Sequence, residues 1–171
     1  MLTLQYNFIT MVRAFFFSPS VTTKKVAEFL STEIDKDVKL YDITLADSKE
    51  TESFLAKDVF LFQTPVYGGR IPKLAKERIS SVKGDGQKAI AVVVYGNRDY
   101  DDALLELADL VKDQGFEIVG AAAFIAQHCI FPKVASNRPD EEDISKIKQF
   151  ANQVKNSIKA GKTLPLEKNK G

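Results

Sequence analysis

The chain is poor in the residues that cross-link proteins or ligate metals. Its 171 residues include one cysteine, Cys129, one histidine, His128, and no tryptophan. A lone cysteine excludes an intrachain disulfide and favours a reducing compartment, so we expect a cytoplasmic protein. No apolar run approaches the roughly 20 residues that cross a bilayer, and residues 1–11 do not resemble a signal peptide. We therefore expect no membrane partner.

The chain also lacks an excess of charge of either sign. The formal net charge is +1, and acidic and basic residues are interspersed. This argues against a nucleic-acid partner, which would leave a basic footprint. The composition, 44% hydrophobic and 27% charged, is that of a soluble globular protein. Without a linker or repeat to divide it, we expect one domain over residues 1–171, with a core at about 12–160, an N-terminal extension at 1–11 and a tail at 161–171.

What the chain does contain is an alternation of short apolar runs and helical patterns. The clearest predicted strand, Lys88 to Tyr95, is apolar on both faces, as a central parallel strand should be. Alternation of this kind predicts an α/β fold, with a parallel sheet and helices on both of its faces. Strands are expected at 12–17, 38–43, 59–62, 88–95 and 117–126, and helices at about 23–33, 72–81, 104–111 and 144–158.

Hydroxyl side chains crowd the segment after the first predicted strand. Ser18, Ser20, Thr22 and Thr23 fall within six positions, directly before a helix. Hydroxyls and unpaired N–H groups at a helix start can cradle a phosphate, helped by the helix dipole. The alternative is that Thr22 or Thr23 only caps the helix. The density of hydroxyls favours a phosphate site.

Glycines and aromatic residues follow the third and fourth predicted strands. The first segment is Thr64-Pro65-Val66-Tyr67-Gly68-Gly69, and the second is Tyr95-Gly96-Asn97-Arg98-Asp99-Tyr100. An aromatic face beside accessible backbone amides suits a planar heteroaromatic ring. The alternative is a plain turn with local packing and, in the second segment, a helix cap at Asp99 or Asp101. Ligands of open parallel sheets bind at the carboxyl ends of the strands, where these segments lie.

These segments resemble the flavodoxin family over roughly residues 12–158. Pro65-Val66-Tyr67-Gly68-Gly69-Arg70 and Tyr95-Gly96-Asn97-Arg98 are similar to strings in the flavodoxin part of bacterial flavodoxin–ferredoxin fusion proteins. Residues 18–23 are similar to the family's phosphate loop. The resemblance implies a three-layer sandwich with a five-stranded sheet in the order 2-1-3-4-5. It also implies an FMN cofactor, and electron transfer with a redox partner protein or a small-molecule electron donor or acceptor.

The cofactor-binding residues that follow from the loops and the resemblance belong to three segments. They are Ser18, Ser20, Val21, Thr22, Thr23, Thr64, Pro65, Val66, Tyr67, Gly68, Gly69, Tyr95, Gly96, Asn97, Arg98 and Tyr100. We expect FMN rather than FAD, because the phosphate loop leads into its helix with no evident room for an adenosine subsite. No side chain is clearly placed as an independent catalytic acid, base or nucleophile.

The chain departs from the family in two places. Val21 stands where the phosphate loop normally has glycine, which is costly for a β-branched residue if that position has a positive φ. The cysteine-rich iron–sulfur segment of the fusion proteins is absent. An alternative function is therefore an FMN-free binding or interaction module with a degraded phosphate loop. A reductase linked to NAD(P)H or a quinone is a further alternative.

Three other features invite a function and are interpreted differently. A phosphorylated receiver domain shares this topology but needs acidic residues where the chain has Ser18-Pro19 and Gln63-Thr64. His128 and Cys129 are adjacent, and neighbours on an extended segment point in opposite directions, so we do not expect a catalytic pair. The acidic run at 140–143 is expected to be a solvated first helical turn.

Overall fold

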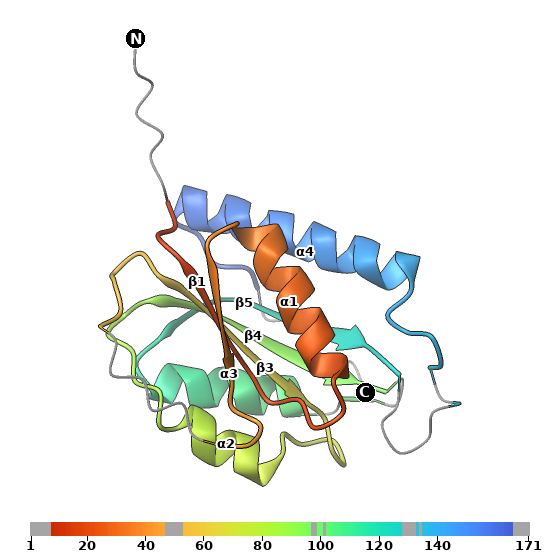
Figure 1. Cartoon of the computed structure of the whole chain (residues 1–171). Helices are drawn as coiled ribbons and strands as arrows, with labels where there is room; N and C mark the ends of the chain where they lie inside the picture. Colours follow the sequence, from red (N-terminus) through yellow and green to blue (C-terminus); the bar gives the residue numbers. More distant parts are fainter. Residues whose placement is uncertain are drawn as a thin grey trace.

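The described part of the chain forms one five-stranded parallel sheet (Figure 1). The computed structural model describes residues 8–46, 53–96, 99–100, 102–127, 133 and 135–165. The strand order is β2-β1-β3-β4-β5, as the family resemblance implied. The strands are β1 (Val12–Phe16), β2 (Val38–Asp42), β3 (Val59–Pro65), β4 (Lys88–Tyr95) and β5 (Glu117–Ile125).

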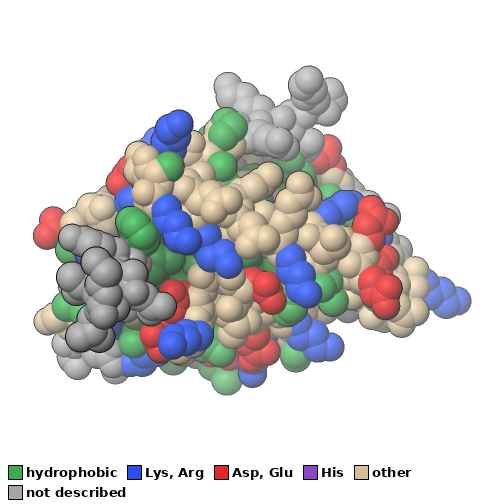
Figure 2. All heavy atoms as spheres, turned by 90° about the horizontal axis from the view of Figure 1, so that it is seen from above, with side chains coloured by type: hydrophobic (Ala, Val, Ile, Leu, Met, Phe, Trp, Pro, Cys, Tyr) green, Lys and Arg blue, Asp and Glu red, His purple; other side chains and the backbone are tan. Residues whose placement is uncertain are grey.

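Helices cover both faces of the sheet and complete the expected three layers. Helices α1 (Thr22–Ile34) and α4 (Glu141–Ala160) pack on one face, and α2 (Lys73–Ile79) and α3 (Ala103–Asp113) on the other (Figure 1). Each helix turns an apolar stripe inward; in α1 that stripe includes Val26, Ala27 and Leu30. Figure 2 views the molecule from the side on which α4 lies in Figure 1. Basic and acidic side chains are interspersed on this face.

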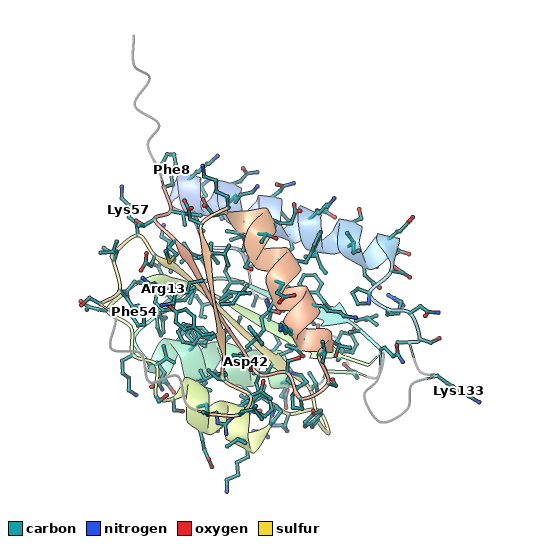
Figure 3. The ribbon with its side chains drawn as sticks, in the orientation of Figure 1. Phe8, Arg13, Asp42, Phe54, Lys57 and Lys133 are labelled. Carbon is teal, nitrogen blue, oxygen red and sulfur yellow. The ribbon has the colours of Figure 1, made fainter. Side chains whose placement is uncertain are left out.

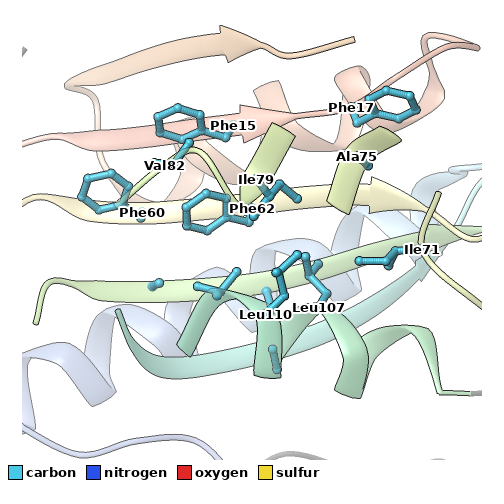
Figure 4. Close-up of a cluster of buried hydrophobic side chains, with 14 of the residues drawn as sticks. Phe15, Phe17, Phe60, Phe62, Ile71, Ala75, Ile79, Val82, Leu107 and Leu110 are labelled. Atoms are coloured by element: carbon cyan, nitrogen blue, oxygen red, sulfur yellow. The ribbon is translucent and has the colours of Figure 1, made fainter. Parts of the chain in front are cut away.

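An aromatic cluster fills the space between the sheet and the α2–α3 layer (Figure 4). Phe15 of β1 stacks on Phe60 and Phe62 of β3, with ring centroids 6.0 and 5.4 Å apart. Phe116 closes the cluster against the same two rings. Because alternate residues of a strand point to opposite faces, Leu61 and Gln63 of β3 lie on the α1–α4 side. The alternation thus decides which side chains reach each helix layer.

A buried ion pair anchors the amino-terminal ends of β1 and β3. Arg13 donates from Nε to Asp58 Oδ2 over 2.7 Å, and its guanidinium lies 5.0 Å from the centre of the Phe54 ring (Figure 3). Asp58 Oδ2 also accepts from the N–H of Leu55. The pair lies at the end of the sheet opposite the predicted site, so we assign it to structure.

Two expectations are wrong, one about where β3 ends and one about the solvation of the acidic run. β3 does not stop before Thr64-Pro65 but continues through Pro65, because β4 pairs with it to the end, while β1 pairs with it only as far as Gln63. Asp143 is not solvated: it is buried and pairs with Arg138. The acidic run does begin a helix, α4. His128 and Cys129 lie outside the described residues.

Candidate functional site

The predicted segments follow β1, β3 and β4, which are neighbours in the sheet. Parallel strands end at the same edge, so residues 18–23, 66–69, 95–96 and 99–100 are brought to one end of the molecule. Thr64 and Pro65 are the last residues of β3, and both are buried. Asn97 and Arg98 lie outside the described residues. The remaining predicted residues all belong to this carboxyl end.

The phosphate-loop candidate contains a strained valine. Val21 immediately precedes α1 and has φ 69° and ψ −23°, in the left-handed region. β-Branched residues rarely adopt this conformation. The helix begins at Thr22, so Thr22 and Thr23 are not its capping residues. The expectation was that Val21 would be strained if its φ were positive, and its φ is positive.

Hydrogen-bond donors at the start of α1 are left without acceptors. Within the described residues, no acceptor pairs with the N–H groups of Thr22 and Thr23. The Thr23 side chain is 1% exposed, and its Oγ1 has no partner there either. The first N–H groups of every α-helix lack intrahelical acceptors, whereas buried hydroxyls are normally paired, so the Thr23 hydroxyl is what sets this helix start apart. An anionic phosphate has the charge and the acceptor atoms that it needs.

Ser18 and Thr44 hold this loop from below. Ser18 Oγ accepts from the N–H of Lys24 over 2.9 Å, and the N–H of Ser18 donates to Thr44 Oγ1 over 2.8 Å. Arg78 of α2 donates to the carbonyl oxygens of Ile43 and Thr44. Sequence reasoning missed Thr44 and Arg78, because neither has a local signal that links it to a segment more than 25 residues away.

Gln63 is a second polar group without a partner near this end of the sheet. It is fully buried on the α1 side of β3, and no described residue bonds to either its Oε1 or its Nε2. The hydroxyl of Thr64, on the opposite face, is also unpaired within the described part of the chain. Sequence reasoning did not include Gln63 in the site, although a polar residue at the end of an apolar strand could have indicated it.

The segment after β3 forms a tight turn that presents Tyr67. The N–H of Tyr67 donates to the Arg70 carbonyl over 2.9 Å, and the N–H of Arg70 donates back over 3.1 Å. Gly68 and Gly69 between them have φ 58° and 77°, which only glycine adopts freely. Tyr67 is 41% exposed. The turn therefore places part of Tyr67 at the molecular surface at this end of the sheet.

Two further tyrosines flank the segment after β4. The rings of Tyr95 and Tyr100 meet edge to face, with centroids 5.3 Å apart. Burial raises the pKa of the Tyr95 phenol above its ordinary value, and the neighbouring Tyr100 raises it further by a smaller amount. Tyr95 is therefore protonated at neutral pH and is a neutral hydrogen-bond donor.

A groove between α1 and α4 adjoins the phosphate-loop candidate. It has a volume of about 440 Å³, and its lining includes Thr22, Lys25, Phe29 and Arg138. The expectation of FMN over FAD assumed no room for an adenosine beside the loop. This groove removes that premise, so the choice of FMN now rests on the family resemblance.

The described residues lack two other kinds of functional feature. They contain no helix long and apolar enough to cross a membrane. Across the same residues, no three His, Cys, Asp or Glu side chains gather as a metal site would require.

Solved flavodoxins share this fold. A flavodoxin from the domain Archaea superposes with a TM-score of 0.59 and 16% identity, covering 87% of this chain and 99% of that one. Flavodoxin 2 from Bacillus cereus gives a TM-score of 0.63 and 18% identity, covering 86% and 99%. An apo NADH:FMN oxidoreductase gives 0.60 and 15%, covering 86% and 89%. These likenesses show a flavodoxin-like fold.

Sequence comparison adds a distant relative. An uncharacterized protein of Methanocaldococcus jannaschii is 26% identical over 138 residues, which are 77% of this chain and 89% of the relative. No protein-family model matches the chain. The chain is thus a flavodoxin-like α/β protein by fold, and its function has to be argued from the site.

Proposed function

We propose that this protein binds FMN at the carboxyl ends of β1, β3 and β4 and acts in electron transfer or as a small flavin-dependent oxidoreductase. The observation that carries the proposal is the unpaired donor cluster at the start of α1. A helix start with unpaired N–H groups and a buried, unpartnered Thr23 hydroxyl offers what a dianionic phosphate needs. The fold shared with flavodoxins supports the same ligand.

The chain's own residues divide the work of binding. The loop at 18–23 would hold the phosphate, and Tyr67 would lie against the ring. The backbone N–H groups of Gly68, Gly69 and Gly96 would face the polar edge of the ring. When bound, the flavin supplies the capacity for one- and two-electron transfer. The donor, the acceptor and a cytoplasmic location belong to this proposal; the lone cysteine supports the location.

The visible spectrum of the purified protein tests the proposal. Flavin absorbance is expected, and mass spectrometry of the ligand released by heating should identify FMN. Recovery of FAD alone would sink the FMN assignment and point to the α1–α4 groove as the adenosine subsite.

A protein that carries no flavin and binds none on reconstitution would favour the alternative, an FMN-free interaction module. The observation behind that alternative is the strained Val21 in the phosphate loop. If FMN is present, titration with NADH and NADPH separates the two forms of the proposal. In a reductase, one of the dinucleotides reduces the flavin and its visible absorbance is lost. In an electron-transfer flavodoxin the absorbance does not change.

A further inference from the structure

A charged clamp connects the Tyr67 turn to helix α3. Arg70 donates from Nε to Glu106 Oε2 over 2.8 Å and from Nη2 to Oε1 over 3.1 Å. The same carboxylate accepts from the N–H of Ile71 over 3.3 Å. A two-point Arg–carboxylate contact fixes orientation as well as distance. Glu106 therefore holds both the side chain and the backbone of the segment that follows the turn.

The clamp joins the two segments expected to hold the ring. Glu106 lies in the first turn of α3, which begins directly after the segment that carries Tyr95 and Tyr100. The N–H of Ala103 donates to the Tyr100 carbonyl over 2.9 Å, so the start of α3 is tied to that segment. A continuous chain of contacts thus runs from Tyr67 to Tyr100 through Arg70 and Glu106.

Stability alone does not account for this pair. The Arg70 side chain is 64% exposed, and exposed ion pairs contribute little to folding. The hydrogen bond from Arg70 lowers the pKa of Glu106, so its carboxylate is charged at neutral pH. Lys76, 3.7 Å from Glu106, adds a second positive charge on that carboxylate. The clamp is thus ionised wherever the protein would work.

We propose that Arg70 and Glu106 are positioning residues that hold the Tyr67 turn at a fixed distance from the start of α3. This sets the affinity for the flavin ring and its reduction potential, and the inference rests on the proposed function. Without the clamp, the turn has to be ordered when the ring binds, at a cost in affinity. With it, the charges of Arg70 and Glu106 largely cancel beside the ring.

The two charges make opposite predictions for the potential. Glu106→Gln leaves Arg70 uncompensated, and a positive charge stabilises the more negative reduced flavin, so the midpoint potential rises. Arg70→Gln leaves the Glu106 carboxylate without its main partner, so the midpoint potential falls. A pair that only stabilised the fold would not separate the two variants in sign.

The experiment compares wild-type protein with Arg70→Gln, Glu106→Gln and the double variant. Each single variant should weaken FMN binding about three- to tenfold in a fluorescence titration. The double variant should be no more than about twofold weaker than the poorer single variant, because residues that act as one unit are not additive. Arg70→Lys keeps the charge but not the two-point contact, so it should keep the potential and lose affinity. Asp109→Asn is the matched control, because Asp109 lines the same surface groove as Arg70 and Glu106, and it should change neither quantity.

A second readout does not need the flavin. Glu106→Gln should speed hydrogen exchange at the N–H groups of Ile71 and Arg70 while leaving the unfolding midpoint unchanged. Additive losses, potentials that move in the same direction, or unchanged exchange at Ile71 would overturn the inference. If wild-type protein binds no flavin, the proposed function fails. The positioning of the turn is then judged by the exchange rates alone.

Discussion

At Val21, the backbone conformation of the loop conflicts with the conformational preference of the residue. Its φ of 69° places a β-branched residue where glycine is free to go, and its side chain is 54% exposed. Strained backbone of this kind costs about 1–3 kcal/mol and gathers at functional loops. The strand before it and the helix after it hold Val21 in this conformation.

Replacing Val21 with glycine is expected to tighten FMN binding about tenfold, which corresponds to relief of about 1–2 kcal/mol of strain. The added mobility of a glycine opposes this gain, but most of the loop is held at both ends. Fluorescence titration of the apo-protein measures the effect. Val21→Ala is the control, because it removes the branch and keeps a Cβ, and its affinity should lie between the other two. Equal or weaker binding by the glycine variant would mean that Val21 is accommodated without strain in the bound state.

Tyr67→Ala is expected to weaken flavin binding by about 1–3 kcal/mol, through loss of a stacked and desolvated ring contact. Tyr67→Phe keeps the ring and should bind within about twofold of wild type if stacking is the main contribution. The dissociation constants of both variants decide the point. An unchanged constant for Tyr67→Ala would remove Tyr67 from the site.

At the scale of elements, the start of α4 shows how charge organises a helix end. Asp140 caps the helix by accepting from the N–H of Asp143 over 3.0 Å, and Asp143 Oδ2 accepts from the N–H of Asp140 over 2.9 Å. The buried Asp143 carboxylate also accepts hydrogen bonds from Nε and Nη2 of Arg138. Reciprocal capping of this kind joins the helix to the segment before it.

Asp143→Asn is expected to lower the free energy of unfolding at pH 7 by about 1–3 kcal/mol, because the cap is weakened and Arg138 loses its buried partner, keeping only the ion pair with Asp140. Urea unfolding measures the change. Glu142→Gln is the control. It disrupts only an exposed ion pair with Lys146, so its effect should be below about 0.5 kcal/mol.

The effect of Asp143 should also depend on pH in a defined direction. The hydrogen bond from Arg138 lowers the pKa of Asp143 in the folded protein below its unfolded value. Its stabilisation is therefore fully present above the unfolded pKa, about 3.9, and is lost as the pH falls through the folded pKa. The difference between wild type and Asp143→Asn should be constant from about pH 5 to 8 and shrink in acid. A difference that grew in acid would contradict this assignment.

At the scale of the whole molecule, binding at the strand ends is coupled to folding. A ligand that binds only the folded state adds about 2.7 kcal/mol to the free energy of unfolding at 100 times its dissociation constant. We expect this from FMN in thermal or urea unfolding. Riboflavin, which lacks the phosphate, should stabilise the protein markedly less at the same concentration. Equal stabilisation by the two would show that the loop at residues 18–23 contributes nothing to binding.

Much of this architecture was predictable because its signals are local. The apolar run of β4 predicted a central strand, and the helical spacing of Val26, Phe29 and Leu30 predicted α1, in which Val26 and Leu30 are buried and Phe29 is half-buried. The carboxyl end of β3 was not predictable by the same reasoning. Gln63, Thr64 and Pro65 look like a stop, yet the N–H of Phe17 donates to the Gln63 carbonyl, and Thr64 and Pro65 stay in register with β4. Pairing with β4 outweighed local preference at these two residues.

By itself, the sequence determined the alternation of strands and helices and the chemical character of the loops, because periodicity and composition act over a few residues. Its resemblance to flavodoxins also implied the strand order. Only the tertiary structure decided how the loops are held. Arg70 meets Glu106 across 36 positions, and Ser18 meets Thr44 across 26. Partners so far apart leave no local pattern, because their meeting depends on the packing of the sheet and its helices. The strained φ of Val21, and a buried Thr23 hydroxyl that no described residue bonds, likewise exist only once strand, loop and helix are assembled.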